Sequence, residues 1–391
     1  MNIRLHSLAL CNILIRVNLN GLEFQHRDSL IINFMSLLSK ASSKSETKSL
    51  RRFLLSRLFY IGDVVLTTPA IRALREAFPE AFIAYLGDKQ AVSLLEQNPF
   101  LDEIIPFDFT RPTLLEQPRV VRLLRRRHFD VAIDFLGNPR SAIFTYLSGA
   151  PVRIGGDFRG RRNLYTIRIH DDGLRRTAVE FHLRYLEPLG IHVKPHSPEL
   201  FLSPEERSQA RDFLLSQGVD ITRPVIGLHA GATWPAKMWL KDRFIELAAA
   251  LYQELGLEVI FTQGPKDSDL MHEIGLSLAN HAKILPVLSL RELAAVLSQC
   301  TIFVANDSGP MHIAAAVGTT TIGIFGPGED DIWFPYDALQ GHIAVRHNVP
   351  CHPCHLNVCN RTDEDYMACM KGVSTEHVFS LISERLSQAG K

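Results

Sequence analysis

Hydrophobic and polar positions follow two alternating periods along most of the chain after residue 52. Short runs rich in β-branched and aromatic residues are separated by stretches whose apolar residues recur at helical spacing. This alternation is typical of parallel sheets with right-handed helical crossovers. The predicted strands are 53–60, 82–86, 103–107, 130–136, 225–229, 258–262, 302–306 and 320–325, and the predicted helices are 69–78, 113–127, 242–255, 267–279, 291–298 and 310–317.

Local signals mark where predicted helices begin. Thr68 before Pro69 is typical of an N-cap followed by proline in the first turn, and Ser203 with Glu206 forms a capping box. The two alternating sets meet near residue 195, so we predict an α/β protein with two Rossmann-like parallel-sheet domains facing across a cleft. The predicted parts are a poorly ordered N-terminal extension at 1–51, domains at 52–195 and 196–373, and a C-terminal helix at 374–391 that packs back on the first domain.

Composition narrows the class of protein. The 391 residues are 46% hydrophobic and 21% charged, which is ordinary for a soluble globular protein and excludes a disordered or fibrous one. No run approaches the ~20 apolar residues that a membrane-spanning helix needs. Arg4 and Arg16 interrupt the N-terminal segment, so a secretory signal fits poorly and we expect a cytoplasmic protein.

Charge is balanced overall but divided unevenly. Lys and Arg total 42, as do Asp and Glu, which argues against a nucleic-acid partner. Residues 51–200 carry 22 basic and 17 acidic side chains, whereas residues 201–391 carry 14 and 22. Either the two domains face different partners, or the surface composition drifts along the chain.

Asp63 is the first candidate for chemistry. It follows Gly62 where a predicted strand ends, and ligands of open α/β sheets bind along that edge. A carboxylate there can serve as a general base. The alternative is that Asp63 only caps a turn or a helix.

Two later segments indicate a phosphate site. Lys237 lies between two tryptophans after strand 225–229, where its ammonium either meets a phosphate or is an ordinary surface charge. Strand 302–306 runs through segment 307–309 directly into a helix, and the free N–H groups of such a turn bind anions. His312, close to that turn, either faces the anion or is structural. The motifs GxGxxG and GxxxxGK[S/T] are absent, which excludes the simplest dinucleotide and P-loop sites.

Three segments, in their order along the chain, resemble a known family. They are Gly62-Asp63 with Thr67-Thr-Pro69, Trp234-Pro-Ala-Lys237-x-Trp239, and Asn306-Asp-Ser-Gly-Pro-Met-His312. So ordered, they resemble the ADP-heptose:lipopolysaccharide heptosyltransferases of glycosyltransferase family 9, over about residues 52–386. The Asn-Asp-Ser and Met-His spelling is more similar to the second and third core heptosyltransferases than to the first. The resemblance implies a GT-B fold, an ADP-activated sugar donor, and an inverting transfer that requires no metal cofactor.

The resemblance also implies roles for particular residues. Asp63 matches the general base, and Lys237 matches the lysine that meets the donor diphosphate. The N–H groups of Ser308 and Gly309 would then stabilise the departing ADP. Looser matches suggest an adenine contact near Glu292 and a ribose contact at Asp267. The implied donor-binding residues are Gly62, Thr233, Lys237, Asp267, Glu292, Asp307, Ser308, Gly309, Met311 and His312.

We therefore predict an inverting glycosyltransferase that moves heptose from ADP-heptose to a lipopolysaccharide inner-core acceptor. The alternatives are a GT-B transferase that uses another nucleotide sugar or glycan acceptor, and a non-catalytic nucleotide-sugar-binding protein. The expected partners are the donor, a lipid-linked oligosaccharide acceptor, and the inner leaflet of the cytoplasmic membrane through peripheral contact. Candidate acceptor or membrane contacts, which are otherwise a solvated face, are Arg125, Arg126, Arg127, Arg161 and Arg162.

Four of the six cysteines lie close together near the C-terminus, with His352 and His355 among them. These side chains are the ligand types of a structural zinc site. The alternative is a redox-sensitive or merely packed cluster. The cysteines are Cys351, Cys354, Cys359 and Cys369.

Overall fold

The computed structural model of the chain describes residues 50–278 and 280–389. The predicted N-terminal extension, 1–51, lies almost entirely outside these residues. Both sheets belong to one compact unit that begins at Arg51. Among the described residues, no helix combines the length and the apolar composition that crossing a bilayer requires.

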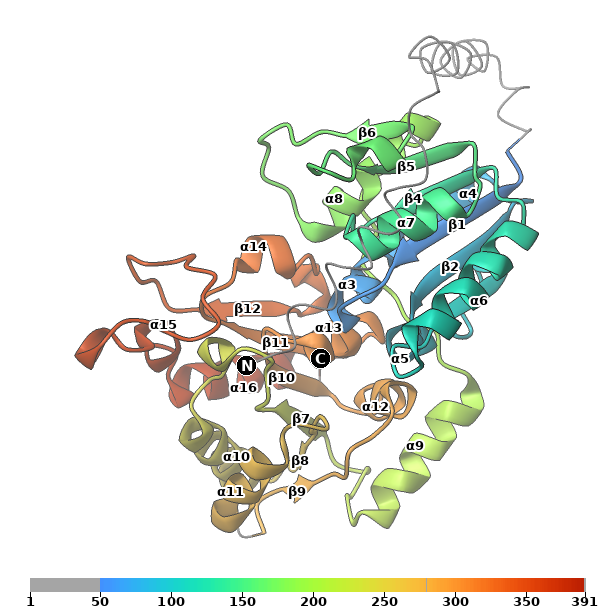
Figure 1. Ribbon diagram of the computed structural model, residues 1–391. Coiled ribbons are helices and arrows are strands. Elements are labelled where there is room, and N and C mark those ends of the chain that lie inside the picture. The colour runs from blue at the N-terminus through green and yellow to red at the C-terminus, as the bar shows by residue number, and fades with distance from the viewer. Residues whose placement is uncertain (1–49, 279, 390–391) are drawn as a thin grey trace. The chain divides into compact units, whose positions relative to one another are not determined.

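The first domain is built on a six-stranded parallel sheet, in the order β3-β2-β1-β4-β5-β6 (Figure 1). Its central strands are buried on both faces, which explains their continuous apolar sequence. The strands are β1 (Arg52–Arg57), β2 (Phe82–Asp88), β3 (Glu103–Phe107), β4 (Val131–Asp134), β5 (Val152–Gly156) and β6 (Ile167–Ile169). The helices are α3 (Ile61–Leu66), α4 (Thr68–Ala77), α5 (Lys89–Val92), α6 (Thr113–Arg126), α7 (Pro139–Leu147) and α8 (Ala178–Arg184).

The second domain repeats the arrangement with a parallel sheet in the order β12-β11-β10-β7-β8-β9. Its strands are β7 (Val225–His229), β8 (Glu258–Phe261), β9 (Lys283–Ile284), β10 (Ile302–Asn306), β11 (Thr320–Phe325) and β12 (Ile343–Arg346). Its helices are α9 (Pro204–Ser216), α10 (Lys241–Leu255), α11 (Ser268–Leu278), α12 (Leu290–Leu297), α13 (Gly309–Ala316), α14 (Asp330–Trp333), α15 (Ala368–Lys371) and α16 (Thr375–Ala389).

The predicted α/β class with two parallel sheets is confirmed, and the capping box at Ser203 and Glu206 is present. Each sheet has six strands where the pattern predicted four, because β5, β6, β9 and β12 are short or partly exposed and carry a weak apolar signal. The first strand ends at Arg57 rather than residue 60, since α3 begins at Ile61.

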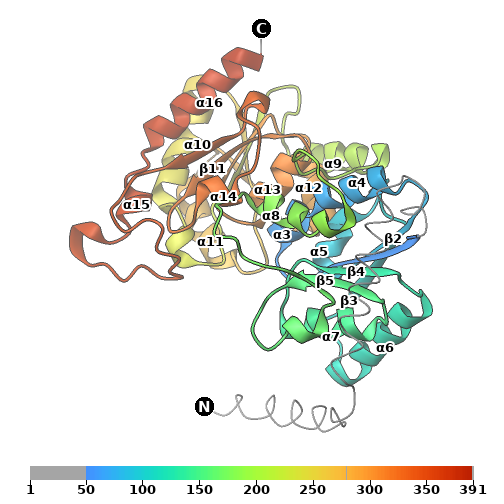
Figure 2. The same ribbon diagram turned by 90° about the horizontal axis from the view of Figure 1, so that it is seen from above.

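Helix α16 packs differently from the prediction. Its apolar residues Val378 and Ile382 join the core of the second domain, where α16 lies against α10 (Figure 2). The Thr375 hydroxyl also hydrogen-bonds Glu246 of α10 at 2.9 Å. The expectation that this helix packs back on the first domain is therefore wrong, because the apolar face it must bury lies on its own domain.

The two domains contact each other at the carboxyl edges of their sheets. Helices α3 and α13 lie side by side there (Figures 1 and 2). A second contact is made by Arg291 of α12, which donates to the carbonyls of Leu94 and Glu96 in the first domain. The elements that carry the predicted base and the predicted anion turn are thus neighbours.

Candidate functional site

Asp63 lies in the first turn of α3 and is largely buried, with 14% of its side chain exposed. Its Oδ1 accepts a hydrogen bond from Arg57, the last residue of β1. Burial raises the pKa of Asp63, whereas the charges of Arg57 and, more weakly, Lys237 lower it. The net pKa is above the usual value for an aspartate, which suits a group that accepts a proton and later releases it.

Two glycines allow α3 and α13 to meet. A Cβ on Gly62 would lie 2.5 Å from Cδ2 of the His312 imidazole, and a Cβ on Gly309 would lie 3.2 Å from Cβ of Ile61. A larger residue at position 62 would clash with the imidazole of His312, so His312 or α3 would have to shift. The sequence elements predicted from separate halves of the chain are therefore brought together, with Asp63 beside the turn 306–309.

Lys237 is held at the carboxyl edge of the second sheet by two contacts. Its Nζ lies 2.6 Å from Oδ2 of the buried Asp307 and 4.7 Å from the centre of the Trp234 ring. The loop after β11 closes on the same carboxylate, since a Cβ on Gly328 would lie 2.7 Å from Oδ2 of Asp307. Three loops thus converge around one cation–carboxylate pair.

The turn into α13 has no side-chain cap. Ser308 occupies the N-cap position, but its side chain makes no capping hydrogen bond, so the first N–H groups of α13 have no side-chain acceptor. Asn306, just before the turn, hydrogen-bonds the neighbouring loop. Its Oδ1 accepts from the backbone N–H of Trp239 at 2.9 Å, and its Nδ2 donates to the Ala230 carbonyl at 2.8 Å. Asn306 therefore ties the Lys237 loop to the end of β10.

The two predicted residues inside α13 are buried. His312 shares a 2.8 Å hydrogen bond with the Tyr336 hydroxyl, and burial lowers the pKa of His312 to about 3, so the imidazole is neutral at pH 7. Met311 is fully buried beneath Gly323 of β11. The structure thus gives Met311 a packing role, and it sets His312 at the contact with α3.

The other predicted donor residues lie farther along the same edge. Asp267 accepts from the Gly264 N–H at 2.7 Å and packs against Gly231, which joins two loops of the second sheet. Glu292 accepts from the Ser289 N–H at 2.8 Å, so it completes the capping box of α12. Thr233 is exposed in the loop before Lys237.

The predicted arginines fall into two groups. Arg125 and Arg127 lie at the end of α6, where Arg127 pairs with Glu103 at the start of β3, so this group is at the edge opposite Asp63. Arg161 lies over the Phe158 ring, which packs on Gly156 at the carboxyl end of β5. The structure therefore brings Arg161, with its neighbour Arg162, to the edge that carries Asp63, and it leaves Arg125, Arg126 and Arg127 away from it.

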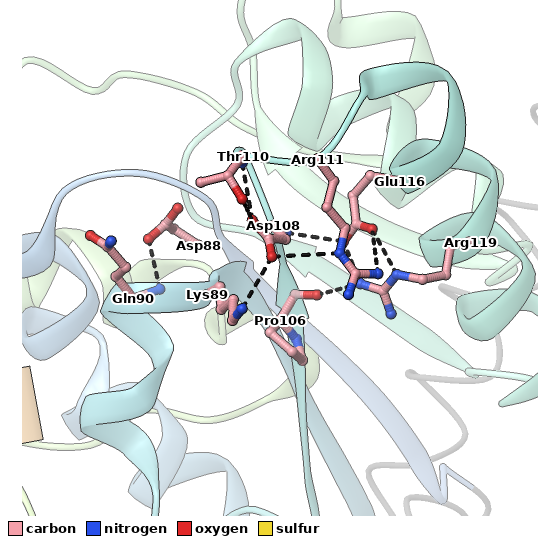
Figure 3. A network of polar contacts seen from close by, with 9 residues as sticks. All are labelled: Asp88, Lys89, Gln90, Pro106, Asp108, Thr110, Arg111, Glu116 and Arg119. Carbon is pink, nitrogen blue, oxygen red and sulfur yellow. Dashed lines mark hydrogen bonds and ion pairs between the residues drawn. The ribbon is translucent and has the colours of Figure 1, made fainter.

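A polar network secures the start of α6 at the Asp63 edge (Figure 3). The buried Glu116 accepts from Arg119 and from the Asp108 N–H, while Asp108 pairs with Lys89 at 3.1 Å. Hydrogen bonds from Thr110, and then Lys89, lower the pKa of Asp108 to about 2. Lys89 and Arg119 are thus each paired with a carboxylate of this network.

Arg140 is a cation of the same edge with a different environment. Its guanidinium lies over the rings of Phe107 and Phe109, at 5.5 and 5.1 Å from their centres. Within the described part of the chain it has no carboxylate partner. Its charge is therefore open to an anionic ligand.

The four clustered cysteines are free thiols that line one cavity of about 290 Å³. Ala236 and Pro327, which belong to the loops around Lys237, also line this cavity. Burial and the neighbouring thiols raise the pKa of Cys369. Across residues 50–278 and 280–389, no group of three or more His, Cys, Asp or Glu side chains is placed so that it could hold a metal ion.

Comparison with known proteins defines the class. The family model of glycosyltransferase family 9 (heptosyltransferase) matches residues 118–363. The chain belongs to this family and is a glycosyltransferase, as the motifs indicated.

Individual proteins of known sequence or structure are also similar to the chain. The chain is 28% identical over 292 residues to lipopolysaccharide heptosyltransferase 3 of Escherichia coli, covering 70% of this chain and 83% of that protein. It is 27% identical over 351 residues to lipopolysaccharide heptosyltransferase 2 of Salmonella typhimurium, covering 83% and 97%. A family 9 glycosyl transferase of Veillonella parvula has a similar structure, with a TM-score of 0.75, 26% identity, and coverage of 86% and 97%. The E. coli ADP-heptose lps heptosyltransferase II shares the fold, with a TM-score of 0.73, 23% identity, and coverage of 88% and 100%.

Three residues that the motifs did not assign a role lie within the site. Arg57 and Tyr336 hydrogen-bond the predicted residues Asp63 and His312, and Asn306 hydrogen-bonds Trp239 and Ala230 on either side of the Lys237 loop. Arg57 and Asn306 each end a buried strand that is otherwise largely apolar. A polar residue at the carboxyl end of such a strand is the signal that points to them, because that edge is where ligands bind.

Proposed function

We propose that this protein transfers heptose from ADP-heptose to the inner core of a lipopolysaccharide, with inversion at the anomeric carbon. The observation that supports it most directly is the contact of α3 with α13, which sets the carboxylate of Asp63 beside an open anion turn and Lys237. The relatives' names state heptose transfer to lipopolysaccharide, and one names ADP-heptose.

In this mechanism the acceptor hydroxyl attacks the anomeric carbon from the side opposite ADP. The new oxygen–carbon bond forms as the bond from the anomeric carbon to the diphosphate oxygen breaks, and Asp63 takes the hydroxyl proton. Negative charge then grows on the leaving diphosphate. Lys237 and the N–H groups of Ser308 and Gly309 stabilise that charge. This stabilisation comes from the chain itself, so we expect no metal requirement and an unchanged rate in EDTA.

The acceptor would bind along the carboxyl edge of the first sheet. Arg140 and Arg161 lie at that edge, and their charges suit anionic groups of a lipid-linked oligosaccharide. Arg125, Arg126 and Arg127 are remote from Asp63, so any role for them is contact with anionic headgroups at the inner leaflet of the cytoplasmic membrane.

The test is the rate of heptose transfer by Asp63→Asn and Asp63→Ala. Lipopolysaccharide from a strain that lacks this gene is the acceptor, and ADP release is followed. Both variants should lose at least about a thousandfold in kcat, with ADP binding within threefold of the parent, because the base meets the acceptor rather than the nucleotide. A variant with parental activity would exclude Asp63 as the base. A panel of nucleotide sugars tests the donor, and preference for a sugar other than ADP-heptose would replace the proposed substrate.

A further inference from the structure

The buried carboxylate of Asp63 is paired with a buried cation, Arg57. Only 11% of its side chain is exposed. Its Nη1 donates to the Phe135 carbonyl at 2.8 Å, just beyond the neighbouring strand β4, and its Nη2 donates to Oδ1 of Asp63. The planar guanidinium therefore joins the ends of two strands to the first turn of α3, with two of its nitrogens fixed in direction.

We propose that Arg57 is a positioning residue that holds the Asp63 carboxylate in the orientation and the ionised state that proton abstraction requires. The proposal rests on the role of Asp63 as base given above. Since Arg57 occupies Oδ1, Oδ2 is the oxygen that receives the proton of the acceptor hydroxyl. A freely rotating carboxylate would lose this selection, and the geometry of proton transfer is sensitive to small misplacements.

The ionised state needs Arg57 because Asp63 is buried. Burial is the largest influence on the pKa of Asp63 and raises it, while Arg57 gives the largest opposing effect. Without that charge the carboxyl would take up a proton at a higher pH and could no longer act as a base.

The remaining groups near Asp63 do not replace this charge. Burial raises the pKa of Tyr85 and lowers those of His182 and His312 to about 3, so all three are neutral at pH 7. Lys237 is cationic, but in the proposed complex it pairs with the donor diphosphate. Arg57 is then the cation that stays with Asp63 during the reaction. The titratable and charged groups around Asp63 are Arg57 on β1, Tyr85 on β2, His182 on α8, Lys237 in the loop after β7, and His312 on α13.

A buried ion pair contributes little net stability compared with apolar side chains of similar size. Arg57→Met is therefore informative, because it removes the charge and keeps the volume. Arg75→Met is the matched control. Arg75 has 17% of its side chain exposed and pairs with Asp102 and backbone carbonyls, but it lies at the opposite edge of the same sheet.

The experiment measures kcat/KM for transfer from ADP-heptose between pH 5.5 and 9.5, with the acceptor described above. In Arg57→Met, the acid limb of the pH profile, where kcat/KM falls as the pH is lowered, should move to higher pH by about one to three pH units. Activity should recover at pH values above this limb. Arg57→Lys retains a cation, so its limb should stay within about half a pH unit of the parent. In Arg75→Met the limb should not move. If Arg57→Met does not fold, Arg57→Gln carries the same test, since it can still donate to the Phe135 carbonyl but has no charge.

A second measurement is independent of activity. In protein labelled with carboxyl-¹³C aspartate, the Asp63 signal is assigned by its loss in Asp63→Asn, and its titration is compared between parent and Arg57→Met. We expect a higher pKa in the variant. Lower activity at every pH, with neither the acid limb nor the carbon titration moved, would overturn the proposal. Full transfer by Asp63→Asn would instead refute the base itself, while the carbon titration would still show whether Arg57 controls the charge of Asp63.

Discussion

The carboxyl edges of the two sheets each carry a largely buried pair of a cation and a carboxylate, and the two pairs are used in opposite ways. On the first sheet Arg57 holds Asp63, and the proposed reactive group is the carboxylate. On the second sheet Asp307 holds Lys237 at 2.6 Å, and the proposed reactive group is the cation. In the proposed mechanism, a cation–carboxylate pair thus provides a base on one side of the junction and a phosphate-binding group on the other.

The difference follows from which partner is fixed. The Arg57 guanidinium is anchored to a backbone carbonyl of the neighbouring strand, so the cation cannot leave its carboxylate easily. Lys237 has a flexible stem and rests on the face of Trp234, so its ammonium can exchange Asp307 for a diphosphate. An anchored cation such as Arg57 therefore influences the pKa and orientation of its carboxylate. A cation on a flexible stem, such as Lys237, can instead move to a ligand.

Removal of Lys237 should have the largest effect in this comparison. Lys237→Met should lower kcat/KM for ADP-heptose by about a hundred- to a thousandfold, because the diphosphate charge loses its main side-chain partner. Steady-state kinetics at fixed pH measure it. Lys241→Met is the control and should stay near the parental rate, because it removes a lysine of α10 that pairs with Glu273 of α11. A loss below threefold in Lys237→Met would rule out a role at the leaving group.

Substitutions in the two arginine groups of the first domain should differ by about one order of magnitude in their effect on the acceptor KM. Arg140→Ala and Arg161→Ala should each raise the acceptor KM by about tenfold, since they remove a charge at the Asp63 edge. Replacing Arg125, Arg126 and Arg127 together by Gln should leave KM unchanged for a delipidated acceptor and weaken sedimentation with anionic vesicles at low salt. The opposite result would place the acceptor at the far edge of the sheet.

The smallest effect expected is that of Asp307→Asn on nucleotide binding. The substitution removes a negative charge next to the proposed diphosphate site, so ADP should bind about fivefold more tightly, on the order of 1 kcal/mol. Titration calorimetry measures it. ADP binding that weakens more than tenfold would mean that Asp307 contacts the nucleotide rather than only holding Lys237.

The alternation of strands and helices predicted both sheets, and the resemblance of three segments predicted the family. The short strands β5 and β6 escaped prediction because residues 137–176 are rich in glycine and arginine and show little periodicity. The hydrophobic pattern also could not predict which face of α13 points toward the site, because that helix is apolar on nearly every side. Met311 was therefore expected at the donor, whereas it is fully buried in the core.

The direction of α6, by contrast, follows from the order of the elements along the chain. A crossover helix runs from the carboxyl edge of a parallel sheet back to its amino edge. The arginines at the end of α6 therefore lie opposite Asp63, and chain order alone implies this. The pairing of Arg57 with Asp63 is different, because it depends on the tight turn before α3 and on the neighbouring strand β4, which the hydrophobic pattern does not specify.

The missing methyl groups of Gly62 and Gly309 have a consequence for how this enzyme can change. The two glycines let α3 and α13 approach closely, and this approach sets the span between the proposed base on α3 and the proposed leaving-group site at the start of α13. If these roles hold, widening that junction for a bulkier acceptor would also move the proposed nucleotide site away from the proposed base. New acceptor specificity would have to arise in the surrounding loops, while the gap between these two helices stays the same.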